Sequence, residues 1–177
     1  MARGADNEQQ DQVDLIVDQW AAERPDVDVS AMEIIGRLGR LERAIRPRLE
    51  AVFAEHGLES WEFDVLATLR RSGEPYQLTP GQLLDSMMVT SGAMTNRIDR
   101  LEDRDFVRRT PHPTDKRQVL VTLTDAGCRN VDAALVDHAA NESALIDAFD
   151  LEQRQQFVDL LRILHRSLIE PPKPPRP

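Results

Sequence analysis

The stretch from Leu78 to Gly127 constrains what this chain can fold into more than any other part of the sequence. Thr79 with Gln82 three positions later, and a proline at the first helical position between them, predicts the start of a short helix. After a turn, a second helix is predicted from about Ser91 to Arg104. Its inward face is marked by three apolar residues at helical spacing, Met94, Ile98 and Leu101.

Two strand-like runs follow the second helix. Phe106 to Thr110 and Gln118 to Thr122 flank a loop that ends in Lys116 and Arg117, and the second run alternates apolar and polar residues. Helix, turn, helix and a basic-tipped hairpin predict a mainly α fold with a small β-hairpin wing, a winged helix-turn-helix. In such a unit the second helix enters the major groove of double-stranded DNA and the wing reaches the backbone or the minor groove.

The overall charge of the chain does not exclude a nucleic-acid partner. The net charge of the 177 residues is −9, but residues 1–35 alone carry nine acidic and two basic residues, a balance of −7. From Phe106 to Val121, four basic residues stand against Asp115 alone, a balance of +3. Acidity is therefore concentrated away from the predicted DNA-facing surface, where a local basic footprint remains.

Composition indicates a soluble globular protein. Apolar residues make up 41% and charged residues 30% of the chain, and no apolar run approaches the ~20 residues that span a bilayer. The polar, acidic N-terminus does not resemble a signal peptide, and the single cysteine, Cys128, fits a reducing compartment. We therefore expect a cytoplasmic protein with no membrane partner and no cofactor.

Amphipathic helices are predicted before the central stretch. The first spans Asp6 to Glu23, and the second is long, begins at a capping box of Ser30 and Glu33, and ends at His56-Gly57. Pro47 lies inside the second helix, so a kink or break is expected there. A third helix, Trp61 to Arg71, is predicted with Ser60 as its cap and with a nearly all-apolar surface that Asp64 interrupts.

Two further helices are predicted after the wing. One begins at Thr124 and reaches about Leu145; the other is capped by Asp150 with Gln153. The apolar stripe of the last helix contains Phe157, Leu160, Leu161, Leu164 and Leu168. Long flanking helices with continuous stripes indicate a homodimer, which presents two recognition helices about one DNA turn apart.

These elements suggest four regions. Residues 1–57 hold the N-terminal helices, 58–124 the winged helix-turn-helix, 125–170 the C-terminal dimerisation helices, and 171–177 a proline-rich tail.

The central stretch resembles a known family. The segments TSGAMTNRIDRLEDRDFVRR and DKRQVLVTLTDAG are similar to the recognition helix and wing of MarR-type transcriptional regulators, and the resemblance extends over roughly Val13 to Leu168. It implies a homodimeric winged-helix protein that usually represses nearby genes until a small ligand or an oxidant releases it.

The N-terminal segment resembles the urate-responsive branch of that family. VDLIVDQWAAERPDVDVSAMEIIGRLGRL is similar to the extra first helix of the branch. The resemblance places an anionic ligand site, for a urate-like or carboxylate effector, on Trp20, Asp64, Arg97 and Arg109. The spacing of Arg97 from Met94 and Leu101 agrees with an inward position, where an unpaired guanidinium would be costly.

Several residues are candidates for DNA contact. On the recognition helix, positions off the inward stripe are Ser91, Gly92, Thr95, Asn96 and Arg100. Asparagine pairs with adenine in the major groove, and serine or threonine contacts phosphate or base, although Ser91 is equally suited to capping the helix. In the wing, Arg117 suits a narrow minor groove, Lys116 suits a phosphate, and Asp115 is expected to structure the turn through Arg117 or Arg104.

Three other functions have little support in the sequence. No metal-binding or catalytic motif joins His56, His112, His138 and His165, so catalysis is not expected. A redox regulator would use Cys128, which carries no motif of such proteins. A winged helix used only for protein contact needs no basic wing, and its DNA binding would lack the steep salt dependence of a true regulator.

Overall fold

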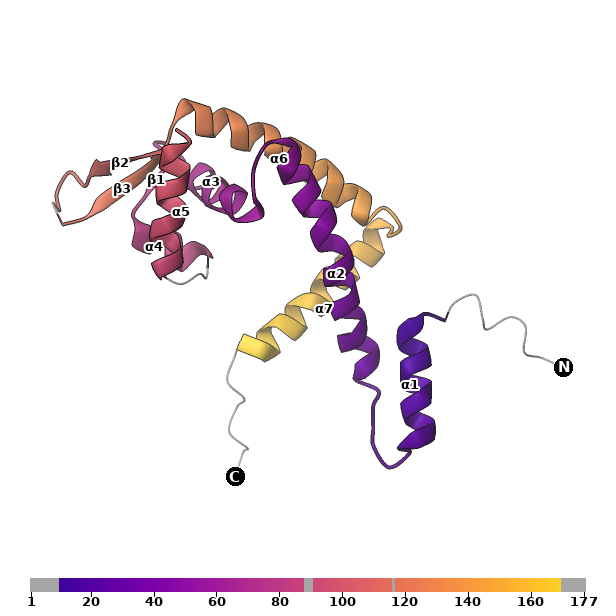
Figure 1. Cartoon of the computed structure of the whole chain (residues 1–177). Helices are drawn as coiled ribbons and strands as arrows, with labels where there is room; N and C mark the ends of the chain where they lie inside the picture. Colours follow the sequence, from indigo (N-terminus) through magenta and orange to yellow (C-terminus); the bar gives the residue numbers. More distant parts are fainter. Residues whose placement is uncertain (1–9, 88–90, 116, 170–177) are drawn as a thin grey trace, which may run out of the picture. The chain divides into compact units, whose positions relative to one another are not determined.

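The computed structural model describes residues 10–87, 91–115 and 117–169, and for residues 91–93 the backbone only. The chain divides into two compact units, Met1–Ala51 and Val52–Pro177. The described part contains seven helices and three short strands, so the mainly α fold class predicted from the sequence is confirmed (Figure 1).

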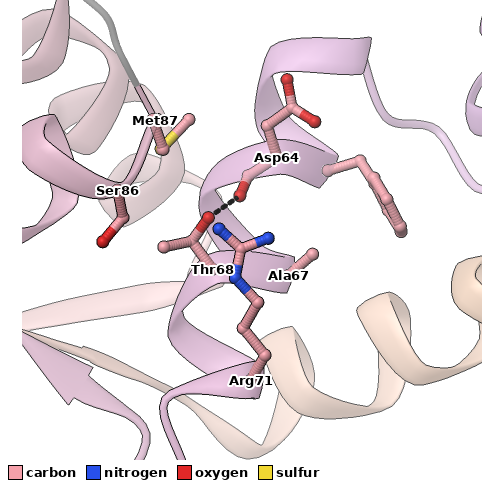
Figure 2. A pocket seen from close by; sticks show the side chains of 7 residues that line it. Asp64, Ala67, Thr68, Arg71, Ser86 and Met87 are labelled. Atoms are coloured by element: carbon pink, nitrogen blue, oxygen red, sulfur yellow. Dashed lines mark hydrogen bonds between the residues drawn. The ribbon is translucent and has the colours of Figure 1, made fainter. Parts of the chain in front are cut away.

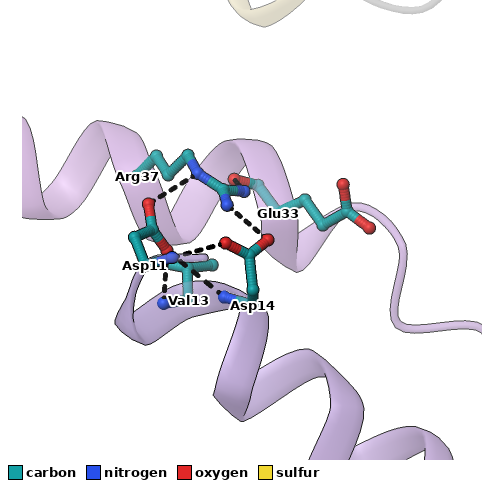
Figure 3. A network of polar contacts seen from close by, with 5 residues as sticks. All are labelled: Asp11, Val13, Asp14, Glu33 and Arg37. Carbon is teal, nitrogen blue, oxygen red and sulfur yellow. Dashed lines mark hydrogen bonds and ion pairs between the residues drawn. The ribbon is translucent and has the colours of Figure 1, made fainter. Parts of the chain in front are cut away.

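In the first unit, α1 (Gln12–Glu23) is attached to α2 (Met32–Glu55) by one buried side chain and one ion-pair network. Val13 is 3% exposed and packs on Gly36, where an added Cβ would lie 3.1 Å from a Val13 methyl carbon. Arg37 donates to the carboxylates of Asp11, at 2.9 Å, and Asp14, at 2.6 Å (Figure 3). Asp11 also caps α1, because its side chain accepts from the backbone N–H of Val13 at 2.6 Å.

The break considered at Pro47 is absent, since α2 continues from Met32 to Glu55. Proline removes one N–H donor and crowds the carbonyl four residues earlier, which belongs to Arg43. Arg43 is exposed, so water can solvate the carbonyl that loses its partner. The free-energy cost of the missing hydrogen bond is therefore too small to break a long helix.

The second unit contains the predicted winged helix-turn-helix (Figure 1). Its helices are α3 (Ser60–Arg71), α4 (Pro80–Met87) and α5 (Ser91–Asp103), and its strands are β1 (Gln77–Leu78), β2 (Val107–Pro111) and β3 (Val119–Leu123). The antiparallel sheet has the order β1-β3-β2. The core between sheet and helices is formed by side chains that are at most 1% exposed: Val65, Leu66, Leu69, Leu83, Met94, Ile98, Leu101, Val107 and Val121.

The first two helices begin later than predicted, α1 at Gln12 instead of Asp6 and α2 at Met32 beyond the expected Ser30 cap, whereas the starts of α4 and α7 are confirmed. The Thr79 backbone N–H donates to Gln82 Oε1 at 2.8 Å, and the Gln82 N–H donates to Thr79 Oγ1 at 3.2 Å. Asp150 and Gln153 exchange the same pair of bonds, both at 2.9 Å. The start of α3 differs from the prediction: the helix begins at Ser60, and its cap position is Glu59.

A buried carboxylate explains that difference. Glu62, 1% exposed, accepts from the backbone N–H of Glu59 at 2.9 Å through Oε2, which also accepts from Arg104 Nη1 at 2.7 Å. A second nitrogen of Arg104 donates to the Gly57 carbonyl at 2.8 Å. The guanidinium compensates the buried charge, so the residue just after α5 is tied to the first turn of α3.

The wing joins α6 (Asp125–Leu145) at a point of very close packing. Thr124 caps α6 by accepting from the Gly127 N–H at 3.0 Å, and its hydroxyl donates to the Asp105 carbonyl at 2.6 Å. A Cβ at position 127 would lie 2.1 Å from the Phe106 carbonyl oxygen, so only glycine fits there. Helix α6 therefore begins directly against the base of β2.

The last helix, α7 (Leu151–Ile169), has no buried residue. Of its predicted apolar stripe, Leu160 is 64% exposed and Leu168 is 77% exposed. An amphipathic helix of this length needs a partner surface for such a stripe. None of the helices in the described residues is long and apolar enough to cross a membrane.

Candidate nucleic-acid interface and ligand pocket

Helix α5 presents a polar outer surface because its apolar residues are fully used in the core. Met94, Ile98 and Leu101 are at most 1% exposed, which confirms the predicted inward stripe. Thr95, Asn96, Asp99 and Arg100 are exposed. The side chains of the two remaining candidates for DNA contact on this helix, Ser91 and Gly92, lie outside the described residues.

One flank of α5 lies against the first turn of α3, through a group that we call the Trp61 cluster: Trp61, Glu59, Arg97 and Arg100. The guanidinium carbons of Arg100 and Arg97 lie 4.7 Å and 5.5 Å from the centre of the indole ring. Glu59 accepts from the indole Nε1 at 2.8 Å and from Arg100.

The pKa of Glu59 is lowered by these hydrogen bonds, first by that of Trp61 and then by that of Arg100. Arg100, expected to meet DNA, is therefore held by the protein itself in the free state. No role was predicted for Trp61 and Glu59 from the sequence, although an aromatic side chain next to a helix start is a visible signal.

The opposite flank of α5 lies against β2 through the Arg109 cluster: Arg109, Asp99 and Glu102. Arg109 Nη2 donates to Asp99 Oδ1 at 2.6 Å and Nη1 to Glu102 Oε2 at 2.5 Å, and the backbone N–H of Arg109 donates to Glu102 Oε1 at 2.8 Å. Burial alone would lower the pKa of Arg109, but the hydrogen bonds to Glu102 and Asp99 outweigh burial and raise it.

In the wing, Asp115 forms hydrogen bonds within the turn, one of them to Arg117, which was one of its two predicted partners. Its carboxylate accepts from the backbone N–H of Arg117 at 3.0 Å and from Gln118 Nε2 at 2.9 Å. The other considered partner, Arg104, instead binds Glu62. Arg117 is exposed, as is Arg108 on β2, while Lys116 lies outside the described residues.

A cavity of about 270 Å³ lies between α3 and α4 (Figure 2). Asp64, Thr68 and Arg71 of α3 face Ser86 and Met87 at the end of α4 (Figure 2). The Thr68 hydroxyl donates to the backbone carbonyl of Asp64 at 2.7 Å, and the Asp64 side chain is part of the cavity lining.

The carboxyl of Asp64 reaches solvent, yet the protein atoms around it displace enough water to raise its pKa. The positive charges of Arg97 and Arg71 counteract this rise only in part. Arg71 lines the cavity together with Asp64, and the positive charge of Arg97, which lies outside the lining, also acts on the Asp64 carboxyl.

Three of the four residues that the resemblance assigned to a ligand site, Asp64, Arg97 and Arg109, belong to the second unit. Burial raises the pKa of Asp64 and the charge of Arg97 acts against this rise, so a shared site for the two residues stays a prediction. Arg109 is not brought to Asp64, because Asp99 and Glu102, on the other flank of α5, bind its guanidinium. Trp20 belongs to the first unit and is 46% exposed. Arg71, for which no role was predicted from the sequence, is the arginine that lines the same cavity as Asp64.

A second, larger cavity lies on the α6 side of α3. Its volume is about 510 Å³, and its walls include Phe63, Ala67 and Arg71, which also line the first cavity. Val131 and Leu135 of α6 add apolar surface, and the Arg70–Asp132 ion pair, at 2.8 Å, stands at its edge. Arg71 thus reaches both cavities.

Cys128 is half-buried on α6. Burial raises the pKa of its thiol, with the charge of Arg70 acting in the opposite direction. A raised pKa reduces the thiolate fraction on which oxidant sensing depends. The geometry therefore gives the redox alternative no support.

A helix-turn-helix core with an antiparallel, basic wing defines a DNA-binding protein of the winged-helix class. The MarR family profile matches residues 58–119. The HTH-type transcriptional regulator PecS of Dickeya dadantii is 38% identical over 158 residues, which cover 89% of this chain and 95% of the relative. The chain belongs to the MarR family.

Solved structures agree with this assignment. AbsC, a MarR family transcriptional regulator from Streptomyces coelicolor, shares the fold with a TM-score of 0.71 at 20% identity, over 80% of this chain and 97% of that one. A mutant MarR of Escherichia coli complexed with operator DNA is 26% identical, with a TM-score of 0.61, over 81% of this chain and all of that one. The relatives are transcriptional regulators and not enzymes, so the protein is a DNA-binding regulator.

Proposed function

We propose that the protein is a cytoplasmic, homodimeric repressor that binds a pseudo-palindromic operator and is released by a small anion. The observation that carries the anion response is the cavity at Asp64: Arg71 lines this cavity, and the positive charge of Arg97 also acts on the Asp64 carboxyl. Arginine suits planar carboxylates and urate-like anions because its donors are arranged in a fixed fork.

DNA reading is assigned to the outer surface of α5 and to the wing. Thr95 and Asn96 are exposed on α5, and Arg117 and Arg108 are exposed on or beside the hairpin. Ser91, Gly92 and Lys116 complete the set on sequence grounds, and Arg100 joins it once Glu59 releases its guanidinium. Base edges are read by the α5 side chains, while wing arginines bind phosphate or the minor groove.

A second copy of the chain is the proposed partner of α7. The helix exposes Leu160, Ile163 and Leu168, each by more than 60%, over a continuous apolar surface. A monomer with one recognition helix would bind an operator weakly, whereas a two-fold dimer reads two half-sites about 34–36 Å apart.

The position of the cavity suggests how an anion lowers operator affinity. Ser86 and Met87, in its wall, are the last described residues before α5, and Arg97 lies on α5 itself. An anion that draws Arg71 and Arg97 together would bind best to one orientation of α5. Operator binding then weakens if that orientation differs from the one that fits the major groove. The resemblance also assigns Trp20 to ligand binding.

A competition titration tests this proposal. Operator binding by the full chain is measured with increasing urate, citrate or salicylate, and Arg71→Gln and Arg97→Gln are compared with the exposed α6 variant Arg129→Gln. We expect an active anion to weaken wild-type and Arg129→Gln binding by about tenfold or more, and to act much less on the two cavity variants. An absence of any effect at millimolar anion, with intact operator binding, would rule out the anion response and leave the regulator assignment standing.

A further inference from the structure

Two acidic side chains lie on the flank of the recognition helix that faces the wing. Asp99 and Glu102 are one helical turn apart on α5, and their side chains are 55% and 38% exposed. Carboxylates at this position are unfavourable for a helix that must approach DNA phosphates, because each adds a repulsive charge within a few ångströms of the groove. Something else must compensate them.

Arg109 supplies that compensation. Its guanidinium, 26% exposed, binds both carboxylates, and the second oxygen of Glu102 accepts the backbone N–H of the same residue at 2.8 Å. Arg109 lies on β2, opposite Val121 of β3, so the bonds connect the recognition helix to the paired strands of the wing. With Arg109 the cluster carries one net negative charge, and without it two.

Both terminal nitrogens of the guanidinium are bound within the protein. Besides the two carboxylates it lies 3.4 Å from the Thr95 carbonyl oxygen, so the acceptors come from three successive turns of one helix flank. Arg108 and Arg117, by contrast, are exposed on the wing. The wing therefore has one arginine that is bound within the protein and two that are exposed and can contact DNA.

We propose that Arg109 is a positioning residue for operator binding: it fixes the wing to the recognition helix and neutralises Asp99 and Glu102, without touching DNA. This role differs from the anion contact that the family resemblance implied for Arg109. It rests on the proposed DNA binding and is independent of the effector, so it stands or fails separately from the anion response.

Salt dependence separates a positioning role from a phosphate contact. A side chain that binds one phosphate contributes about 0.9 to the slope of log affinity against log salt concentration. We expect Arg109→Gln to weaken operator binding of the full chain roughly tenfold at low salt, with a change in slope clearly smaller than the ~0.9 of one lost phosphate contact. Arg117→Gln, the matched arginine variant in the wing, should weaken binding and reduce the slope by about 0.9.

A double variant tests the neutralisation directly. In the Arg109→Gln background, Asp99→Asn removes the charge that is left uncompensated, so part of the lost affinity should return. Arg109→Lys keeps one charge but cannot reach both carboxylates with a fork, and we expect an intermediate affinity. If Arg109→Gln does not fold, as judged by circular dichroism, the comparison is made between Arg109→Lys with and without Asp99→Asn.

Three results would overturn the proposal. A slope reduced by about 0.9 in Arg109→Gln would mean that Arg109 binds a phosphate itself. Wild-type operator affinity in Arg109→Gln, with or without a lost anion response, would remove the positioning role. A failure of Asp99→Asn to recover any affinity, in whichever Arg109 background folds, would show that the cluster does not neutralise the DNA-facing surface.

Discussion

The two flanks of the recognition helix are built with opposite polarity. On the α3 side, α5 contributes the arginines, Arg97 and Arg100, and α3 contributes the ring face of Trp61 together with the carboxylate of Glu59 just before it. On the β2 side, α5 contributes the acids and the scaffold contributes the arginine, Arg109.

The difference has a consequence for DNA binding. Breaking the Trp61 cluster releases positive charge from α5, which a phosphate can bind. Breaking the Arg109 cluster releases negative charge, which a phosphate repels. In the proposed complex with DNA, the Trp61 cluster can therefore release an arginine to a phosphate, whereas the ion pairs of the Arg109 cluster must remain intact.

The largest expected effect is on stability, and it concerns another ion pair on the α3 side, between Arg104 and the buried Glu62. Arg104→Gln leaves a carboxylate that is 1% exposed without its cation, and we expect a loss of about 2–3 kcal/mol in the free energy of unfolding. Urea unfolding measures it, with Arg129→Gln as the exposed control, expected to stay within about 0.5 kcal/mol of the wild type. A double variant with Glu62→Gln should recover part of the loss; equal stability of Arg104→Gln and wild type would mean that this tie is dispensable.

Glu59→Gln sharpens the contrast between the flanks with a smaller effect. It removes the anion that competes with DNA for Arg100, so operator affinity should rise about two- to fivefold. The opposite substitution pattern on the other flank, Arg109→Gln, weakens binding. Fluorescence anisotropy at low salt measures both changes. Unchanged affinity in Glu59→Gln would show that Arg100 stays with Trp61 in the complex.

The smallest effect is a pH dependence of opposite sign at two carboxyl groups. The pKa of Glu59 is lowered, so its contribution to stability is present above about pH 4.3 and is lost as the pH falls through the folded-state value. The pKa of Asp64 is raised by burial, so its contribution is present below about pH 3.9 and is lost as the pH rises through the folded-state value.

Thermal unfolding between pH 3 and pH 7 compares Glu59→Gln and Asp64→Asn with the wild type. Relative to wild type, Asp64→Asn should gain stability as the pH rises and Glu59→Gln should lose it, each by about 2 °C or less because both groups are exposed. Parallel curves for the two variants would contradict the opposite shifts.

Periodicity and capping chemistry were sufficient to predict the fold. The stripe of Met94, Ile98 and Leu101 fixed which face of α5 is buried, and Thr79 with Gln82 fixed where α4 begins. Each depends on residues close in sequence, so local rules apply. The strands were displaced by a single residue, since alternation marks a face better than an end.

The ion pairs could not be predicted in the same way. Arg109 was expected beside Asp64, but its guanidinium lies beside two carboxylates on the nearer flank of α5. A long side chain has several partners within reach, and its choice depends on the spacing between elements, which periodicity does not encode. Arg71 beside Asp64 was missed for the same reason, although both lie on one face of α3.

Close packing at Gly127 leaves no space between the start of α6 and the base of β2. No side chain separates the helix from the Phe106 carbonyl, and Thr124 bonds to the neighbouring Asp105 carbonyl. A force applied along α6 is therefore transmitted to the base of β2 without first being absorbed by a shift of rotamers. A displacement of α6 at Gly127 would therefore act directly on the start of the strand that carries Arg109.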